Sequence, residues 1–200
     1  MYDLIIQNAN IVDGTLKSAF ISDIAILDDT IIKRGKNLGK AKEYYDAEGL
    51  TLCPGIIDIH THYDAQLTWD PTASPSLELG VTTAIIGNCG FTIAPCRKQD
   101  RDLNMKNLTK VEGMPYQTLK KGIDWSYKTY SDYLKLLEAK NLSLNICSYI
   151  GHSALRIWCM GEDAMKRKAT EEEILEMENV VKNAMKSGAI GFSTSTFEGH

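Results

Sequence analysis

Long hydrophobic runs and clusters of basic residues are both missing from this 200-residue sequence. No stretch of about 18 apolar residues occurs, and the N-terminus lacks the basic and apolar regions of a signal peptide. Acidic and basic residues are mixed along a chain of net charge −4, so no basic surface for nucleic acid or for a membrane is indicated. We therefore expect a cytoplasmic protein with neither kind of partner.

Paired cysteines are missing too. The five cysteines are an odd number and show no C-x-x-C spacing, which argues against a disulfide framework and against a zinc ribbon. The motifs G-x-S-x-G and G-x-G-x-x-G and the phosphate-binding lysine motif are also absent. Serine hydrolases with a nucleophile elbow, dinucleotide-binding proteins and P-loop proteins therefore lack their signatures here.

What the sequence does contain is a change of pattern after about 50 residues. The first part alternates short β-rich runs, among them 4–6, 11–12, 21–27, 30–32 and 44–46, with turn signals, and it indicates a small sheet. Later, near-continuous apolar strands expected at 55–60, 82–86, 144–150 and 189–193 alternate with helices expected at 76–79, 130–140 and 170–186. This alternation is typical of parallel βα units whose strands are covered on both faces.

The helix expected at 170–186 has the strongest local signals. Thr170 followed by Glu173 makes a capping box, and Gly188 is a C-terminal stop signal. Its predicted apolar face consists of Ile174, Met177, Val181 and Ala184.

In contrast, residues 96–127 are rich in polar side chains and long for a βα connection, so we expect either a loop over the site or an exposed insertion.

Residues 55–64 read G-I-I-D-I-H-T-H-Y-D and join an apolar strand to two histidines. On an extended strand, side chains two positions apart point the same way, so His60 and His62 would lie about 7 Å apart along the chain, in phase with Asp58 and Asp64. Such clustering of ligand-type residues at a strand end favours a metal site over a structural role.

Other polar residues follow the later strands. Cys89 lies in I-I-G-N-C-G-F, where it is expected either to pack as a small apolar residue or to bind a metal facing the histidines. His152 ends the third strand and would either contact a substrate or cap a loop. The serines after the fourth strand are typical of turn chemistry.

Four segments in this order resemble the amidohydrolase superfamily, and within it the D-aminoacylase (N-acyl-D-amino-acid deacylase) branch. They are P-G-I-I-D-I-H-T-H-Y-D, G-V-T-T-A-I-I-G-N-C-G-F-T-I-A-P, I-G-H-S-A-L-R and G-A-I-G-F-S-T-S. The resemblance implies an α/β fold, in which a small β-sandwich segment (1–53) precedes the first half, about four βα units (54–200), of a (β/α)8 metal-dependent hydrolase barrel.

The resemblance also implies a reaction and a set of residues. The expected activity is the zinc-dependent hydrolysis of N-acyl-D-amino acids, with one or two zinc ions held by His60, His62 and Cys89. Asp64, Asn88 and His152 are the candidate substrate-binding residues. The general acid/base aspartate is expected beyond residue 200, because the family takes it from a later strand.

A barrel needs eight strands to close, and only about four are expected here. We therefore favour an N-terminal fragment of a longer deacylase. The alternatives are one subunit of a split enzyme whose second chain supplies the other half-barrel, a non-catalytic remnant that binds a metal or a partner, and a cyclic-amide hydrolase of the same superfamily.

Overall fold

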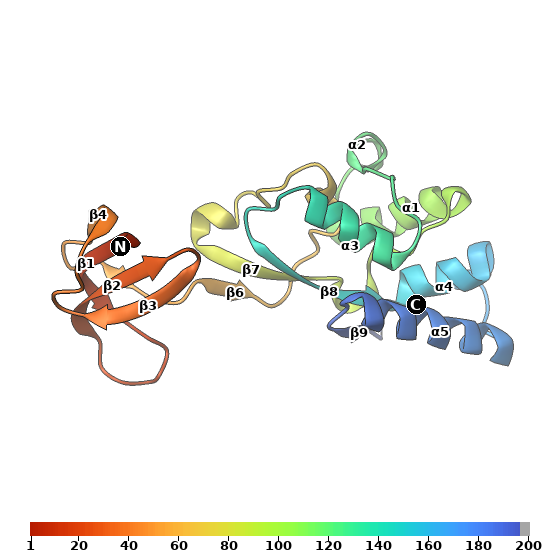
Figure 1. Ribbon diagram of the computed structural model, residues 1–200. Helices are drawn as coiled ribbons and strands as arrows, with labels where there is room; N and C mark the ends of the chain where they lie inside the picture. Colours follow the sequence, from red (N-terminus) through yellow and green to blue (C-terminus); the bar gives the residue numbers. More distant parts are fainter. Residues whose placement is uncertain (197–200) are drawn as a thin grey trace. The chain divides into compact units, whose positions relative to one another are not determined.

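A computed structural model describes residues 1–196, apart from the side chains of residues 111 and 112. The chain forms two compact units, Met1–Gly55 and a larger one that begins at Ile56 (Figure 1). Within the described residues, no helix is both long and apolar enough to cross a membrane.

The first unit is a small sheet. Its strands are β1 (Tyr2–Ile11), β2 (Phe20–Leu27), β3 (Thr30–Gly35), β4 (Ala41–Asp46) and β5 (Thr51–Leu52). They follow the order β3-β2-β1-β4, and β5 also pairs with β1. Neighbouring residues Ile24 and Ala25 belong to two separate apolar clusters, because successive side chains of a strand face opposite sides of the sheet.

The two β-rich runs expected at Leu4–Ile6 and Ile11–Val12 are not separate strands. A single strand, β1, spans almost all of both runs, and its pairing with β2 shifts between Ile6 and Ala9. Asn8 has a left-handed φ of 54°, which is typical of an irregularity that adds a residue to one strand. The polar residues between the runs therefore mark a bulge instead of a turn.

The second unit is built on a curled parallel sheet. Its strands are β6 (Ile56–Asp58), β7 (Val81–Ile86), β8 (Asn145–Gly151) and β9 (Gly191–Ser193), paired in chain order. Its α-helices are α1 (Arg101–Glu112), α2 (Tyr116–Gly122), α3 (Tyr130–Ala139), α4 (His152–Met160) and α5 (Glu171–Ser187). A small sheet followed by a parallel half-barrel confirms the α/β fold class predicted from the sequence.

Two helices match their sequence signals closely. The predicted capping box of α5 is present, since the hydroxyl of Thr170 accepts a hydrogen bond from the Glu173 amide, and Gly188 ends the helix with a φ of 115°. Helix α3 has a second capping box, formed by Thr129 and Asp132. On the predicted apolar face of α5, Met177 and Ala184 are buried, whereas Ile174 is 48% exposed.

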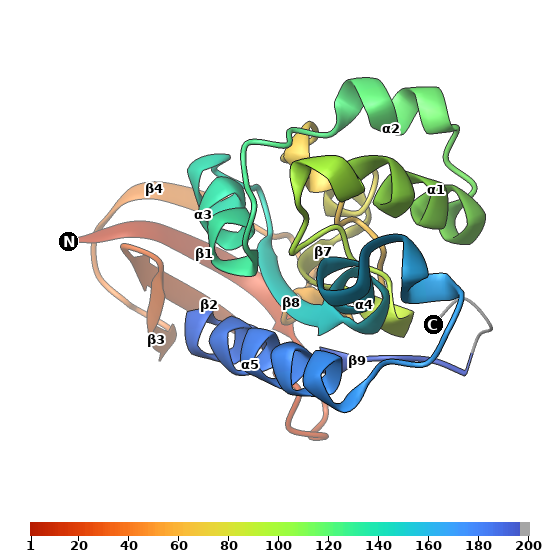
Figure 2. The same cartoon turned by 90° about the vertical axis from the view of Figure 1, so that its right-hand side faces the viewer.

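The prediction of a loop or an exposed insertion at 96–127 was wrong, because this segment folds into the 3-10 helix η4 (Lys98–Asp100) and helices α1 and α2. Leu108 and Leu119 are completely buried and pack in the main core, so the segment belongs to the fold itself. Both views show α1 and α2 side by side, and α4 beside α5 (Figures 1 and 2).

Helix α4 was not predicted either. It follows β8 without a loop and has no side-chain N-cap, so no local signal marks its beginning. The helix expected at 76–79 is a single 3-10 turn, η2 (Leu77–Leu79).

Strand β6 departs from the expectation that both faces of every strand are covered. It lies at the edge of the sheet, where Ile56 and Ile57 are 53% and 60% exposed, and Ile59, just after the strand, is 70% exposed. Because β6 has a neighbour on one side only, its apolar run is not evidence of a buried central strand.

Candidate metal centre

Three side chains converge at the carboxyl ends of β6 and β7. His60 and His62 follow β6, and Cys89 lies in the turn η3 (Asn88–Gly90) after β7. One ligand atom from each lies within 4.8 Å of the others, and His60 Nε2 is 3.1 Å from Cys89 Sγ. The parallel pairing of β6 with β7 produces this convergence, since the carboxyl ends of both strands meet at one edge of the sheet.

The path of the chain to the histidines differs from the prediction. Strand β6 ends at Asp58, because the Oδ1 atom of Asp58 accepts a hydrogen bond from the His60 amide at 3.1 Å. Such a contact between a side chain and the backbone two residues on is typical of an Asx turn, which competes with strand pairing. The strand alternation that predicted a common face for Asp58, His60, His62 and Asp64 therefore does not extend beyond Asp58.

His62 has the features of a neutral ligand. Its Nδ1 atom is buried and has no hydrogen-bond partner among the described residues. Burial, and to a smaller extent the nearby His60, lower the pKa of His62 below its usual value. A neutral imidazole with an unused nitrogen is the form that binds a metal ion.

Cys89 is presented by a turn with unusual backbone angles. Cys89 has a φ of 55°, and the glycines on either side of the Asn88–Cys89 pair, Gly87 and Gly90, have φ values of 77° and 83°. A Cβ atom at Gly87 would lie only 2.5 Å from the carbonyl oxygen of Tyr149. This position therefore needs glycine both for its backbone angle and for lack of space.

Asn88 links the two segments that carry the candidate metal ligands. Its Nδ2 atom donates to the carbonyl of Thr61, between the two histidines, at 3.1 Å and to the carbonyl of Ile85 at 2.8 Å. The amide and hydroxyl of Thr61 also donate to Ile85. The Asn88 amide, predicted to contact substrate, thus makes its observed contacts with the backbone around the site.

Asp64, the second candidate for substrate binding, is completely buried. Its Oδ2 atom accepts a hydrogen bond from the Gly87 amide at 3.0 Å, and its own carbonyl accepts one from the Tyr133 hydroxyl at 2.9 Å. Burial raises the pKa of Asp64 to about 7. In this structure the Asp64 side chain therefore binds the start of the Cys89 turn through the Gly87 amide and does not face solvent.

His152, the third candidate, is the first residue of α4 and lies at the carboxyl end of β8. Its Nδ1 atom is 2.9 Å from the Thr194 hydroxyl, and its ring packs edge-on against Phe192. These contacts join the ends of β8 and β9. The group of ligand atoms formed by His60, His62 and Cys89 does not include His152.

Two serines at this site were not among the candidates predicted from the sequence. Ser193 was assigned to turn chemistry, and Ser153 counted only as a polar residue at the end of the third expected strand, yet both hydroxyl groups bind the backbone of the Cys89 turn. The only available signal was their place at the ends of the third and fourth expected strands.

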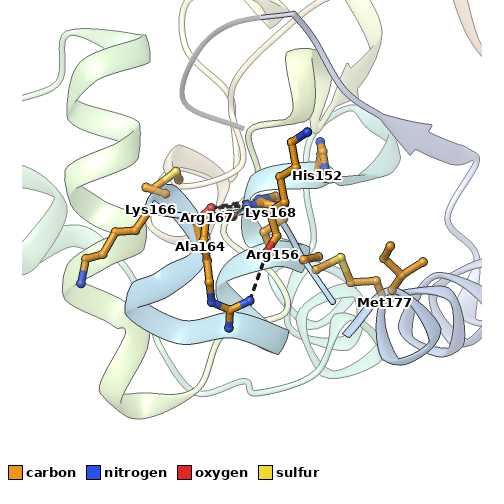
Figure 3. Close-up of a pocket in the computed structure, with 10 residues that line it drawn as sticks. His152, Arg156, Ala164, Lys166, Arg167, Lys168 and Met177 are labelled. Carbon is orange, nitrogen blue, oxygen red and sulfur yellow. Dashed lines mark hydrogen bonds between the residues drawn. The ribbon is translucent and has the colours of Figure 1, made fainter. Parts of the chain in front are cut away.

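A separate cavity of about 610 Å³ lies among α4, η5 (Gly161–Met165) and α5 (Figure 3). Its lining includes the basic side chains of His152, Arg156, Lys166, Arg167 and Lys168. The Nε atom of Arg156 donates to the Ala164 carbonyl at 3.0 Å, and Arg167 pairs with Glu173 at 2.6 Å. Both guanidinium groups are therefore engaged in holding this part of the chain together, and none of the three ligand residues lines the cavity.

Comparison with known proteins agrees with this geometry. A model described as the amidohydrolase family matches residues 43–200. The D-aminoacylase of Alcaligenes xylosoxydans xylosoxydans is 33% identical over 198 residues, which cover 98% of this chain and 38% of that enzyme. The chain belongs to the amidohydrolase family. It spans about two fifths of the length of this relative.

Solved structures place this amidohydrolase near the D-aminoacylase branch. A crystal structure of D-aminoacylase, said to define a subset of amidohydrolases, matches 97% of the chain with a TM-score of 0.82 and 32% identity, over 38% of its own length. N-acyl-D-glutamate deacylase from Bordetella bronchiseptica, complexed with zinc and a phosphonate inhibitor, matches 96% of the chain and 38% of itself, with a TM-score of 0.77 and 25% identity. The resemblance predicted from the four sequence segments is confirmed.

Proposed function

We propose that this amidohydrolase contributes the first part of a zinc site that hydrolyses the amide bond of N-acyl-D-amino acids. The observation that carries the proposal is the convergence of His60, His62 and Cys89 within 4.8 Å. Two imidazoles and a thiolate suit zinc, which prefers nitrogen and sulfur ligands in tetrahedral sites. The unpartnered Nδ1 atom of His62 and the zinc in the Bordetella bronchiseptica deacylase support the same choice.

The residues of this chain would hold the ion and leave room for the substrate. A bound zinc ion would supply Lewis acidity, which polarises an amide carbonyl and lowers the pKa of a bound water toward about 7. His60 is exposed and Cys89 is half-buried, so the side of the site that faces solvent is open to a small molecule. A catalytic zinc site needs such access, because water or substrate occupies one of the coordination positions of the metal.

We further propose that the general acid/base aspartate lies outside residues 1–200. The nearby aspartates are already engaged, because Asp58 accepts the His60 amide and Asp64 is buried against Gly87. The relatives named above are more than twice as long as this chain. Residues 1–53 would then form part of a β-sandwich domain, and residues 54–200 the first half of a barrel that is completed by further chain or by a second subunit.

His152 is the most exposed of the three candidates for substrate binding. Contact with substrate stays a prediction for His152, Asn88 and Asp64. The cytoplasmic location and the absence of nucleic-acid and membrane partners also stay predictions from the sequence.

The test compares metal content and hydrolysis in the same purified samples. The wild-type protein is measured beside the triple variant His60→Ala/His62→Ala/Cys89→Ala and beside Cys53→Ala, which removes an exposed cysteine outside the site. The substrates are N-acetyl-D-amino acids, their L counterparts and a hydantoin. We expect zinc in the wild type and in Cys53→Ala and none in the triple variant.

Each result has a defined meaning. Zinc that disappears from the triple variant together with D-selective hydrolysis supports both the site and the reaction. Zinc that disappears without any hydrolysis in the wild type supports the site and places the missing catalytic groups outside these residues. Equal zinc in all three proteins contradicts the site, and hydrolysis of the hydantoin alone contradicts the proposed substrate class.

A further inference from the structure

The turn that carries Cys89 is held by side chains from three other segments. The amide of Gly87 donates to Asp64 Oδ2 at 3.0 Å, and the Gly87 carbonyl accepts a hydrogen bond from the Ser193 hydroxyl. At the other end of the turn, the Gly90 amide donates to Ser193 Oγ at 3.1 Å, and the Gly90 carbonyl accepts from Ser153 Oγ at 2.8 Å. All four backbone polar groups of the two glycines are thus bound by side chains.

Ser193 has a special place among these anchors, because a single hydroxyl bridges both ends of the turn. It accepts from one glycine and donates to the other, which uses both hydrogen-bonding capacities of a serine. Ser193 is the last residue of β9 and lies opposite Gly151 in the pairing with β8. A Cβ atom at Gly151 would be only 2.7 Å from the Gly90 carbonyl oxygen, so this register brings β8 and β9 directly against the turn.

These hydrogen bonds with Asp64, Ser193 and Ser153 matter because Cys89 adopts a left-handed backbone conformation that residues other than glycine rarely adopt. With a φ of 55°, the Cys89 backbone is strained unless its surroundings hold it in place. A relaxed turn would swing the Cys89 Sγ atom away from the position 3.1 Å from His60 Nε2. Loss of these hydrogen bonds would therefore leave all three candidate ligands in the chain but change the position of Cys89 Sγ relative to the histidines.

We infer that Ser193 and Ser153 are positioning residues that fix the Cys89 thiolate relative to His60 and His62 for metal binding. This inference rests on the proposed metal site. It predicts that removing the Ser193 hydroxyl weakens metal binding about 10-fold to 100-fold, the range typical of residues that orient metal ligands. Ser153 anchors one backbone group instead of two, so its removal has a smaller effect in the same direction.

Cobalt(II) binding tests the inference, because a thiolate ligand to cobalt produces a charge-transfer absorption band in the near ultraviolet. The proteins are the wild type, Ser193→Ala, Ser193→Thr and Ser153→Ala. Ser187→Ala is the matched control, since the Ser187 hydroxyl is exposed and donates only to Asn183 in its own helix. Each metal-free protein is first checked for folding by circular dichroism, and cobalt is then titrated in competition with a chelator.

We expect Ser193→Ala to bind cobalt about 10-fold to 100-fold more weakly and to show a shifted or smaller thiolate band. Ser193→Thr keeps the hydroxyl and restores both quantities toward the wild type, and Ser187→Ala matches the wild type. If Ser193→Ala does not fold, the cobalt affinity and the thiolate band of Ser153→Ala are compared with those of the wild type instead. A purely structural role would lower the thermal stability of the metal-free variants without changing the affinity or the spectrum of the folded protein.

The inference is overturned if the folded serine variants bind cobalt with wild-type affinity and an unchanged band. A wild-type protein that binds cobalt without any thiolate band is a different failure. It would remove Cys89 from the metal site, and the positioning role of the serines would be rejected with it.

Discussion

The Nε2 atom of His60 lies 3.1 Å from the Sγ atom of Cys89, although 29 positions separate the two residues in the sequence. The two strands that precede them are parallel neighbours, and Asn88 bonds the backbone between the histidines to the end of β7. Strand pairing and the Asn88 side chain therefore bring the three candidate ligands together through contacts within the chain itself. The stability of these contacts can be measured on the metal-free protein.

Replacing Asn88 tests this link. Asn88→Ala removes two hydrogen bonds to carbonyl groups of Thr61 and Ile85, and we expect it to lower the free energy of unfolding by about 1–3 kcal/mol. Urea denaturation of the metal-free protein measures the change. Asn145→Ala is the control, because Asn145 also donates to a strand carbonyl but is exposed. Equal effects of the two substitutions would contradict the link.

Gly87 is predicted to tolerate no side chain. Gly87→Ala would place a Cβ atom 2.5 Å from the Tyr149 carbonyl oxygen in a residue with a left-handed φ of 77°. Gly113→Ala isolates the effect of the backbone angle, since Gly113 has a φ of 64° and, in the part of the chain that the structure describes, no atom within 4 Å of its Cβ position. We expect Gly113→Ala to cost about 1–2 kcal/mol of unfolding free energy and Gly87→Ala clearly more, as measured by urea denaturation. Similar costs would show that Tyr149 can move aside.

The thiol of Cys96 is predicted to be unreactive in the folded protein. Cys96 is 1% exposed, and burial, followed by the charge of Asp100, raises its pKa to about 12. Raising the pH from 7 to 9 should therefore not make it react with a thiol reagent, because the thiolate is the reactive form. Peptide mapping after labelling checks this, with exposed Cys53 as the internal control. Labelling of both cysteines at the same rate in the native protein would contradict the prediction.

The ion pair at the start of α5 should make stability depend on pH in the acidic range. The hydrogen bond from Arg167 and the Thr170 amide lower the pKa of Glu173 to about 2. A carboxylate whose pKa is lowered by folding stabilises the protein fully above its unfolded value of about 4.3, and the contribution disappears as the pH falls toward 2.

Glu173→Gln should therefore lower the melting temperature at pH 7 and have progressively less effect between pH 4 and pH 2. Thermal unfolding at several pH values measures the difference. Glu171→Gln is the control, because Glu171 lies in the same first turn of α5 but is exposed. A difference that stays constant down to pH 2 would assign the effect to lost packing instead of charge. High salt should reduce the difference in melting temperature at pH 7, because the Arg167 side chain is 41% exposed.

Local sequence signals are sufficient to predict some helices of this protein and not others. The capping box of Thr170 and Glu173 predicted α5 nearly to the residue, because both partners lie within one helical turn. Helix α4 has no such signal, since it begins directly after β8 with Gly151 as its N-cap. Helices α1 and α2 were missed because their polar composition resembles a loop, while the few apolar residues that bury them, such as Leu108 and Leu119, are decisive only after packing.

The sequence by itself identified His60 and His62 as candidate metal ligands, because they cluster with carboxylates at the end of an apolar strand. It left Cys89 open between packing and metal binding, and the resemblance to the amidohydrolase family favoured Cys89 as a ligand. Only the tertiary structure decided that Asp64 is buried and binds the Gly87 amide, and that Asn88 joins the two segments. It also decided that Ser193 reaches Gly87 and Gly90 across more than 100 residues. Local spacing is encoded in periodicity and caps. Contacts between distant segments depend on strand register and packing, which no short stretch of sequence specifies.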